Sequence, residues 1–195
     1  IGLLRPGALL IGLLEPHHGA GLDALAQAGV SAIALERIPR ISRAQAMDVL
    51  SSQAGIAGYR AVIEAAARAR RFLPLMMTPA GTAKAARVVV LGVGVAGLQA
   101  IATARRLGAQ VEAFDVRPDT REQVLSLGAK FIDIDVGEAG AGAGGYAREL
   151  SAQAQQRQQE LLADRLAAAD VIITTALVPG RAAPVLVRPE VVARM

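Results

Sequence analysis

The sequence predicts an α/β fold: a Rossmann-type doubly wound parallel sheet, preceded by part of a second, smaller α/β domain. Short runs of β-branched and aliphatic residues alternate with longer helix-forming segments, and glycines or prolines stand at most of the boundaries. The apolar runs also lack the polar alternation of a sheet with one face in water. The chain has 195 residues, of which 53% are hydrophobic and 19% charged, so it can bury a sizeable core.

Residues 1–51 are predicted to form the partial N-terminal domain. Strands are expected over residues 8–14 and 30–35, with a helix over 22–27 between them that stops before Gly29. Ser42 or Ser51 is expected to cap a following helix, rich in alanine and arginine, that reaches residue 72. The sequence begins without methionine and within an apolar pattern, so we expect a segment of a longer protein.

Residues 52–195 are predicted to form the Rossmann domain, truncated at its C-terminus. Residues 74–86 hold two prolines and a glycine and are expected to be a connector. Residues 136–145, mostly glycine and alanine, are expected to form a mobile loop. The expected strands cover residues 88–91, 110–114, 130–134 and 170–175, and the expected helices cover residues 95–107, 117–128 and 147–168.

The composition excludes several classes of protein. The absence of cysteine excludes disulfides, thiolate zinc sites and cysteine nucleophiles. Only 3% of the residues are aromatic and the arginines are scattered, so nucleic-acid binding is not expected. The longest uncharged stretch, residues 88–104, is shorter than the ~20 residues of a membrane helix and contains three glycines, so no direct membrane insertion is expected. His17 and His18 have no third ligand at a metal-like spacing, so no metal site is expected.

The sharpest motif is a glycine turn at residues 92–97, directly after one expected strand and directly before a helix. In such a turn the first glycine, here Gly92, permits a tight bend, and the second, Gly94, lets a pyrophosphate approach the backbone. The third, Gly97, lets the helix pack closely on the sheet. The start of the helix then offers unpaired N–H groups to phosphate, so the motif predicts dinucleotide binding.

An acidic residue at the end of the next expected strand supports this prediction. Asp115 follows the motif by roughly 20 residues, where a carboxylate can accept both hydroxyls of the adenosine ribose and repel a 2′-phosphate. The expected cofactor is therefore NAD(H) rather than NADP(H). Arg117 stands two residues further on, and an arginine can accommodate such a phosphate. The alternative is a doubly wound sheet whose glycine turn binds no ligand.

Four segments carry a resemblance to one family. RVVVLGVGVAGLQAIATARRLGAQVEAFD (residues 87–115) resembles the family shared by proton-translocating nicotinamide nucleotide transhydrogenases and alanine dehydrogenases. PRISRAQAMDVLSSQAGIAGYRAVIEAA (39–66), GGYARELS (144–151) and DVIITTALVPGRAAPVLV (170–187) narrow the resemblance to the NAD(H)-binding domain I of the transhydrogenase alpha subunit. The resemblance covers most of the chain from about residue 30 onward.

The resemblance implies an activity and its partners. Hydride would pass from NADH on this chain to NADP⁺ on a partner domain, in a Re/Si-specific, proton-translocating transhydrogenase. Other domains or subunits of the complex would bind NADP(H) and span the membrane. This chain would form a homodimer and be cytoplasmic, peripheral at the inner face of a bacterial membrane through its complex.

The resemblance and the glycine motif together give the expected site. The nucleotide would be covered by a loop that ends at Gly145 and Tyr146. The residues expected at the nicotinamide or acting in catalysis are Arg40, Gln45, Asp48, Ser51 and Tyr146. The residues expected to contact the rest of the cofactor are Gly92, Val93, Gly94, Val95, Gly97, Asp115, Val116, Arg117, Gly145, Gln158 and Leu177.

Other functions stay open on the residues alone. An alanine-dehydrogenase-like amino-acid dehydrogenase would need a substrate-activating lysine and a histidine. The only lysines, Lys84 and Lys130, lie outside the N-terminal part where that chemistry belongs. A non-catalytic NAD-sensing or docking module would need no lid over the nucleotide. For the group around Arg40, the alternative is an ordinary solvated start of a helix.

Overall fold

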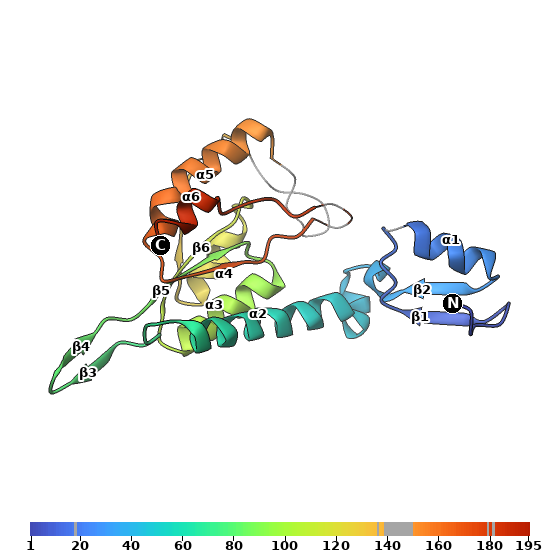
Figure 1. Ribbon diagram of the computed structural model, residues 1–195, viewed down its shortest axis with the longest axis horizontal. Coiled ribbons are helices and arrows are strands. Elements are labelled where there is room, and N and C mark those ends of the chain that lie inside the picture. The colour runs from blue at the N-terminus through green and yellow to red at the C-terminus, as the bar shows by residue number, and fades with distance from the viewer. Residues whose placement is uncertain (18, 136, 139–149, 179, 181) are drawn as a thin grey trace. The chain divides into compact units, whose positions relative to one another are not determined.

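The computed structural model describes residues 1–17, 19–135, 137–138, 150–178, 180 and 182–195 (Figure 1). These residues form two compact units. Unit 1 holds residues 1–53 with Gly180 and Ala182, and unit 2 holds residues 54–178 and 183–195.

Unit 1 is built on a βαβ element. Its two strands, β1 (Leu9–Gly12) and β2 (Ser31–Ala34), pair in parallel, and α1 (Gly19–Gln27) connects them. The strands and the helix predicted for this part are therefore confirmed. Two 3-10 helices, Leu35–Arg37 and Ser42–Met47, then lead to the long helix α2 (Val49–Arg68), which continues into unit 2.

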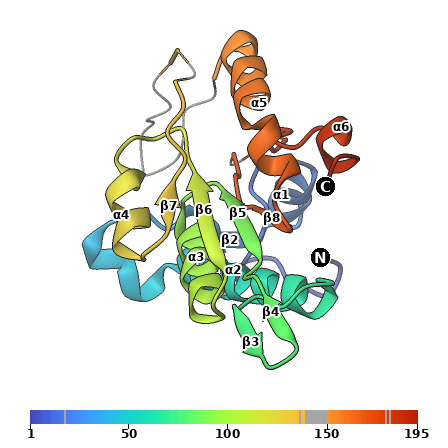
Figure 2. The same cartoon turned by 90° about the vertical axis from the view of Figure 1, so that its left-hand side faces the viewer.

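Unit 2 contains a four-stranded parallel sheet with the order β7-β6-β5-β8 (Figure 2). The strands are β5 (Arg87–Leu91), β6 (Gln110–Phe114), β7 (Lys130–Phe131) and β8 (Val171–Thr174). The chain adds β6 and β7 on one side of β5 and then returns to place β8 on the other side. The carboxyl ends of β5 and β8 therefore flank the topological switch point, where open α/β sheets bind their ligands.

Helices cover both faces of this sheet. Val88 and Val90 of β5 belong to a buried cluster with side chains of α2, α3 and α4. Val89 and Leu91, which point to the opposite face, belong to a second cluster with side chains of α5 and α6. This two-sided burial confirms the predicted Rossmann-type doubly wound sheet. The helices are α3 (Val95–Arg106), α4 (Thr120–Ser126), α5 (Ala152–Ala167) and α6 (Pro189–Val192).

The expected connector at residues 74–86 contains an antiparallel hairpin instead. Its strands are β3 (Met76–Thr78) and β4 (Gly81–Ala83), and Figure 1 shows the hairpin extending away from the sheet of unit 2. Gly81 has a φ of 142°, which a residue with a side chain rarely adopts. The prolines and the glycine thus mark a turn within the segment, and the prediction of a plain connector is wrong.

The cap of α2 also differs from the expectation. Asp48, rather than Ser42 or Ser51, precedes the helix, and its Oδ1 accepts a hydrogen bond of 2.9 Å from the backbone N–H of Ser51. An aspartate at this position satisfies one of the unpaired N–H groups of the first turn. Ser51 lies inside that turn, and Ser42 opens the preceding 3-10 helix.

Several further elements are shorter than predicted, among them α4, which covers Thr120–Ser126 within the predicted residues 117–128. β7 covers only Lys130 and Phe131, because it is an edge strand that pairs with β6 at those two residues alone. α5 begins at Ala152, where the hydroxyl of Ser151 accepts from the N–H of Ala154 at 3.2 Å. Within the described ranges, no helix has both the length and the apolar character needed to cross a bilayer.

Asp170 connects three separate segments at the amino ends of β5 and β8. One carboxylate oxygen accepts the backbone N–H of Arg87 at 2.8 Å, and the other accepts Nη1 of Arg71 at 2.8 Å. Burial raises the pKa of Asp170, but the Arg87 amide and the Arg71 guanidinium outweigh it and hold this pKa below its usual value. A carboxyl whose pKa is lowered by folding stabilises the fold at neutral pH, and this contribution is lost as the pH falls through the folded-state pKa.

We therefore expect Asp170→Asn to reduce the free energy of unfolding at pH 7 by about 1.5–3 kcal/mol, the range for a hydrogen bond to a charged group. The difference between wild type and variant should begin to shrink as the pH falls to about 4, the ordinary pKa of an aspartate in the unfolded chain, and should vanish once the folded carboxyl, whose pKa is lower, is protonated. Urea denaturation over this pH range measures both effects. Asp164→Asn is the matched control, because Asp164 is exposed and pairs only with Arg194 among the described ion pairs. A constant difference at all pH values would contradict the assignment.

Candidate functional site

The glycine turn joins β5 to α3 at the switch point. Gly92 has a φ of 96°, in the left-handed region that glycine adopts without strain. A Cβ atom at Gly97 would overlap the carbonyl oxygen of Gly92, so the helix backbone packs directly on the turn. These geometries confirm the tight bend predicted at Gly92 and the close packing predicted at Gly97.

Gly94 differs from the other two glycines. Its φ is −87°, which any residue can adopt, and a Cβ placed on it would meet no atom within 4 Å. Neither backbone conformation nor protein packing therefore requires glycine here. Because glycine has no side chain, there is open space beside the first turn of α3, where another molecule can approach the backbone.

The first turn of α3 has no side-chain cap. Gly94 occupies the N-cap position and has no side chain to cap the helix, and within the described residues no other side chain is found to accept a hydrogen bond there. The first N–H groups of an α-helix have no partner within the helix, and the helix dipole places a partial positive charge on them. This arrangement can bind a phosphate or pyrophosphate group through backbone atoms alone.

Asp115 lies at the carboxyl end of β6 and is buried, with 8% of its surface exposed. Its Oδ2 accepts the backbone N–H of Val93 in the glycine turn at 2.7 Å and Nη2 of Arg117 at 2.8 Å. Its Oδ1 accepts the backbone N–H and Nε of Arg117, both at 2.9 Å. A carboxylate has about four lone-pair directions. A ribose hydroxyl that donates to Asp115 must therefore share or replace one of the Arg117 donors.

Arg117 belongs to the same hydrogen-bond network as Asp115. Besides its bonds to Asp115, its Nη2 donates to the carbonyl oxygen of Val93 at 3.1 Å. The hydrogen bonds to Asp115 raise the pKa of Arg117 and outweigh the opposing effect of burial. Since Nε and Nη2 already face a carboxylate, this guanidinium is poorly placed to receive a 2′-phosphate.

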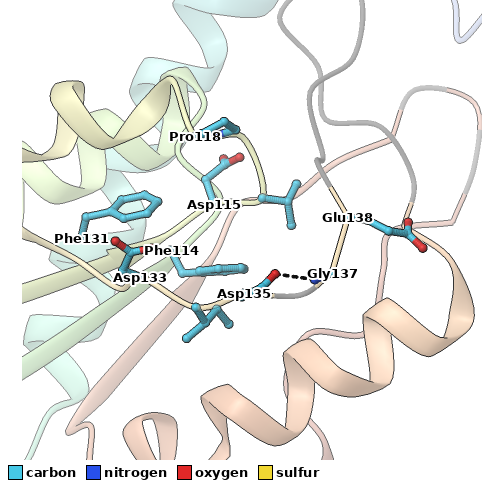
Figure 3. Close-up of a pocket in the computed structure, with 10 residues that line it drawn as sticks. Phe114, Asp115, Pro118, Phe131, Asp133, Asp135, Gly137 and Glu138 are labelled. Atoms are coloured by element: carbon cyan, nitrogen blue, oxygen red, sulfur yellow. Dashed lines mark hydrogen bonds between the residues drawn. The ribbon is translucent and has the colours of Figure 1, made fainter.

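A pocket of about 380 Å³ opens beside Asp115, at the carboxyl ends of β6 and β7. Figure 3 shows Phe131 on the strand side of this pocket and Glu138 on the opposite side. Asp135 also lines it and accepts the backbone N–H of Gly137 at 2.8 Å. The pocket combines apolar walls with an acidic rim. Its aromatic and acidic lining residues are Phe114, Phe131, Asp115, Asp133, Asp135 and Glu138.

Gln158 is the second of four buried residues of α5, with 4% of its surface exposed. Among the described residues no hydrogen bond to its side-chain amide is found.

The remaining predicted cofactor residues are spread around the same end of the sheet. Val93 is fully buried in the turn and Val95 opens α3, while Val116 lines the pocket. Leu177 follows β8 and is 68% exposed. Gly145 and Tyr146, and with them most of the expected mobile loop, lie outside the described residues.

Three of the residues expected at the nicotinamide form a cluster in unit 1, which we call the Arg40 cluster: Arg40, Asp48 and Ser51. The Ser51 hydroxyl donates to Oδ2 of Asp48 at 2.6 Å and accepts from Nη2 of Arg40 at 3.3 Å. Nε of Arg40 lies 3.8 Å from Oδ2 of Asp48. Gln45 is exposed on the preceding 3-10 helix, and no contact of its side chain with the cluster is found among the described residues.

The cluster keeps Asp48 ionised. The Ser51 hydroxyl and the Ser51 amide lower the pKa of Asp48, burial opposes them, and the charge of Arg40 lowers it further. A carboxylate held in this state is an acceptor and a charge partner rather than a proton donor at neutral pH. Among the described residues no group of three or more His, Asp or Glu side chains is arranged to hold a metal ion.

Thr175 is a site residue that the sequence analysis did not find. It follows β8 directly, and its hydroxyl donates to the carbonyl oxygen of Gly92 at 2.8 Å. Its position in the sequence could have indicated this role, because a polar residue at the carboxyl end of the strand next to the glycine turn lies at the switch point. That signal is usable only when the order of the strands is known.

The fold and the site together define a Rossmann-type α/β protein, with its glycine turn at the switch point and an acid after the second strand of the sheet. The chain belongs to the alanine dehydrogenase/PNT family. The family model "Alanine dehydrogenase/PNT, C-terminal domain" matches residues 61–195, and "Alanine dehydrogenase/PNT, N-terminal domain" matches residues 1–57. The family resemblance found in the sequence is thus confirmed.

Proteins similar to this chain are named as transhydrogenase subunits. The first part of the NAD(P) transhydrogenase subunit alpha of Rhodospirillum rubrum is 50% identical over all of this chain and 52% of its own length. Its counterpart in Rickettsia prowazekii is 46% identical over 98% of the chain and 50% of its own length. This chain therefore spans about half the length of these relatives.

Solved structures agree with this relationship. The transhydrogenase of Sinorhizobium meliloti matches with a TM-score of 0.85 and 51% identity, over 98% of this chain and 51% of that protein. An L-alanine dehydrogenase matches with a TM-score of 0.71 and 25% identity, over 100% of this chain and 49% of that protein. The likeness in fold extends to both branches of the family.

Proposed function

We propose that this chain is the NAD(H)-binding component of a proton-translocating NAD(P) transhydrogenase, in which hydride passes from NADH here to NADP⁺ on a partner domain. The observation that carries the proposal is the uncapped start of α3 behind the glycine turn, at the switch point of the sheet. The names and similarity of the relatives support the transhydrogenase branch over the alanine dehydrogenase branch.

The residues of unit 2 fit an NAD(H) molecule in three places. The N–H groups at the start of α3 would take the pyrophosphate, with Gly94 leaving room for it. Asp115 would take the adenosine ribose, with Val116 and the pocket beside it for the adenine. The carboxylates around this pocket, and the engagement of Arg117 with Asp115, disfavour the extra phosphate of NADP(H).

The bound nicotinamide supplies the hydride. Direct transfer between two nicotinamides exchanges no proton with solvent at the reacting carbons, so the protein must position the ring and exclude water rather than provide an acid and a base. We propose that the Arg40 cluster and Gln45 orient the nicotinamide end. The ionised Asp48 fits this role because it fixes the Arg40 guanidinium without offering a proton.

The remaining parts of the proposal follow the family resemblance. Residues 1–51 would belong to the partial N-terminal domain and residues 52–195 to the NAD(H)-binding domain. Gly145 and Tyr146 would close over the nucleotide, and Leu177 would contact it. The partners would be a second copy of the chain and the NADP(H)-binding and membrane domains of the complex, which would hold this chain at the cytoplasmic face of the membrane. The transfer would have Re/Si specificity.

Two measurements test the proposal. Parallel fluorescence titrations with NADH and NADPH should show binding of NADH and weak or no binding of NADPH. With the partner domains added, NADH should reduce an analogue of NADP⁺. Reduction of NAD⁺ by alanine without any partner would instead establish an alanine dehydrogenase, and NADH binding without transfer in the complete complex would favour a sensing or docking module.

The Arg40 cluster gives a sharper test within the complex. Ser51→Ala removes the hydroxyl that joins Asp48 to Arg40, so we expect the rate of hydride transfer to fall about tenfold, since one lost charge-assisted hydrogen bond is worth about 1.5 kcal/mol. Ser52→Ala is the matched control: the neighbouring hydroxyl is exposed and donates only to the carbonyl oxygen of Val49. Equal transfer rates in both variants would remove the cluster from the proposed site.

A further inference from the structure

We propose that Thr175 is a positioning residue that fixes the peptide group between Gly92 and Val93, and so aims the amides of the glycine turn. The proposal rests on the proposed function, because the turn is the place where a pyrophosphate would bind. Thr175 lies on the β8 side of the switch point, opposite to Asp115.

The peptide group between Gly92 and Val93 is held at both ends. Its carbonyl oxygen accepts the Thr175 hydroxyl at 2.8 Å, from the side of β8. Its N–H donates to Oδ2 of Asp115 at 2.7 Å, from the side of β6. A peptide group is planar, so two bonds on opposite edges fix its rotation. The orientation of this group sets the direction in which the chain enters Gly94 and α3.

Packing leaves the Thr175 hydroxyl little freedom to move. A Cβ atom on Gly92 would come within 2.9 Å of this oxygen, and one on Gly97 within 3.0 Å. The hydroxyl therefore occupies the space that both glycines leave free. The backbone of Thr175 is anchored as well, because its N–H donates to the carbonyl oxygen of Leu91 at 2.8 Å.

The Thr175 hydroxyl thus links the two sides of the switch point through the carbonyl group of Gly92, next to the backbone bond between Thr175 and Leu91. β5 and β8 are neighbours along their length, but their chains separate beyond Leu91 and Thr174. The Thr175 hydroxyl is the side-chain link at the point of separation, and Leu177, which is expected to contact the cofactor, follows two residues later. Thr175 therefore also sets the spacing between the pyrophosphate amides and that segment.

The test compares Thr175→Val, which keeps the shape but loses the hydroxyl, with Thr175→Ser, which keeps the hydroxyl. We expect the Kd for NADH to rise about fivefold in Thr175→Val, the effect of one hydrogen bond, and to return close to the wild-type value in Thr175→Ser. NADH fluorescence reports the binding directly, since the chain contains no tryptophan. Amide hydrogen exchange of residues 92–97 should be faster in Thr175→Val alone, with or without nucleotide.

Thr103→Val is the matched control for a merely structural effect. Thr103 is buried, and its hydroxyl donates to the carbonyl oxygen of Gln99 at 2.8 Å within α3, so the same chemical change is made away from the turn. We expect this variant to change thermal stability without changing the NADH Kd or the exchange of residues 92–97.

The outcomes separate the two proposals. Unchanged exchange in Thr175→Val, or an equal rise of the Kd in the valine and serine variants, would overturn the positioning role while leaving NADH binding intact. Absence of NADH binding in the wild type would overturn the proposed function. The exchange measurement would then still decide whether Thr175 holds the turn.

Discussion

Replacing Gly97 with alanine is expected to lower the free energy of unfolding by about 3 kcal/mol or more and to abolish measurable NADH binding. The new Cβ would overlap the carbonyl oxygen of Gly92 and lie 3.0 Å from Oγ1 of Thr175. Neither neighbour can move freely, because one is backbone and the other is bonded to that backbone. The first turn of α3 would have to move away from the sheet, and overpacking of this kind is costly.

Gly94→Ala is the matched comparison, because it adds the same methyl group three residues earlier. Its Cβ would meet no protein atom within 4 Å, so we expect the stability to stay within about 0.5 kcal/mol of wild type. NADH binding should nevertheless weaken at least about tenfold, since the methyl group would fill the space for the pyrophosphate. Thermal denaturation and NADH titration of both variants separate the two roles. Wild-type affinity in Gly94→Ala would show that the nucleotide binds elsewhere.

The sequence was sufficient to predict the centre of the fold. β6 has the predicted bounds, and β5 and α3 begin and end within one residue of prediction, because the apolar run of β5 and the glycines that follow β5 and α3 leave little ambiguity. The elements at the edge of the fold were harder to predict from the sequence. The strands of the hairpin β3–β4 have three residues each, too few for a recognisable strand pattern, and the prolines and the glycine of this segment therefore favoured a connector.

Close contacts between segments far apart in sequence could not be predicted. A Cβ atom on Gly58 would overlap the carbonyl oxygen of Ala96, so α2 lies directly against the start of α3, but no local pattern distinguishes Gly58 from other glycines of α2. Thr175 is a similar case, since its partner Gly92 is 83 residues away.

The sequence predicted which residues belong to the site, but not the hydrogen bonds between them. The sequence placed Asp115 at the end of β6 as an acceptor for a ribose, and the structure shows that it also binds the glycine turn and Arg117. The nicotinamide residues were expected as a group, and in the part of the chain that the structure describes the contacts found among them join Arg40, Asp48 and Ser51. Spacing along a helix cannot predict this, because Gln45 lies on the 3-10 helix whereas Asp48 lies at the junction between that helix and α2.

Asp115→Asn is expected to have the second large effect, on stability and on cofactor choice together. The carboxylate accepts four hydrogen bonds, and the ion pair with Arg117 is largely buried, with 5% of the Asp115 side chain and 16% of the Arg117 side chain exposed. The asparagine amide has one acceptor oxygen, so in either orientation its NH₂ group faces hydrogen-bond donors. In one orientation these donors belong to Val93 and Arg117, and in the other they belong to Arg117 alone. Leaving a buried charge without its partner costs about 3 kcal/mol.

The same substitution changes the cofactor site in two ways. It removes the acceptor proposed for the ribose hydroxyls, and it releases the Arg117 guanidinium, which can then face a 2′-phosphate. We therefore expect NADH affinity to fall about tenfold and the preference for NADH over NADPH to narrow, in titrations at a temperature where the variant is folded.

Asp133→Asn tests whether these effects belong to Asp115 itself or to the loss of any negative charge at the pocket. Asp133 lines the same pocket, but its side chain is 72% exposed and its ion pair with Arg121 lies at the surface. Such a pair contributes little to stability, so we expect a change within about 0.5 kcal/mol and a small change in NADH affinity. If Asp133→Asn narrows the cofactor preference as much as Asp115→Asn, the general charge of the rim excludes the 2′-phosphate. If only Asp115→Asn does so, the exclusion depends on the bonds that hold Arg117, and the same carboxylate both shapes the glycine turn and selects the cofactor.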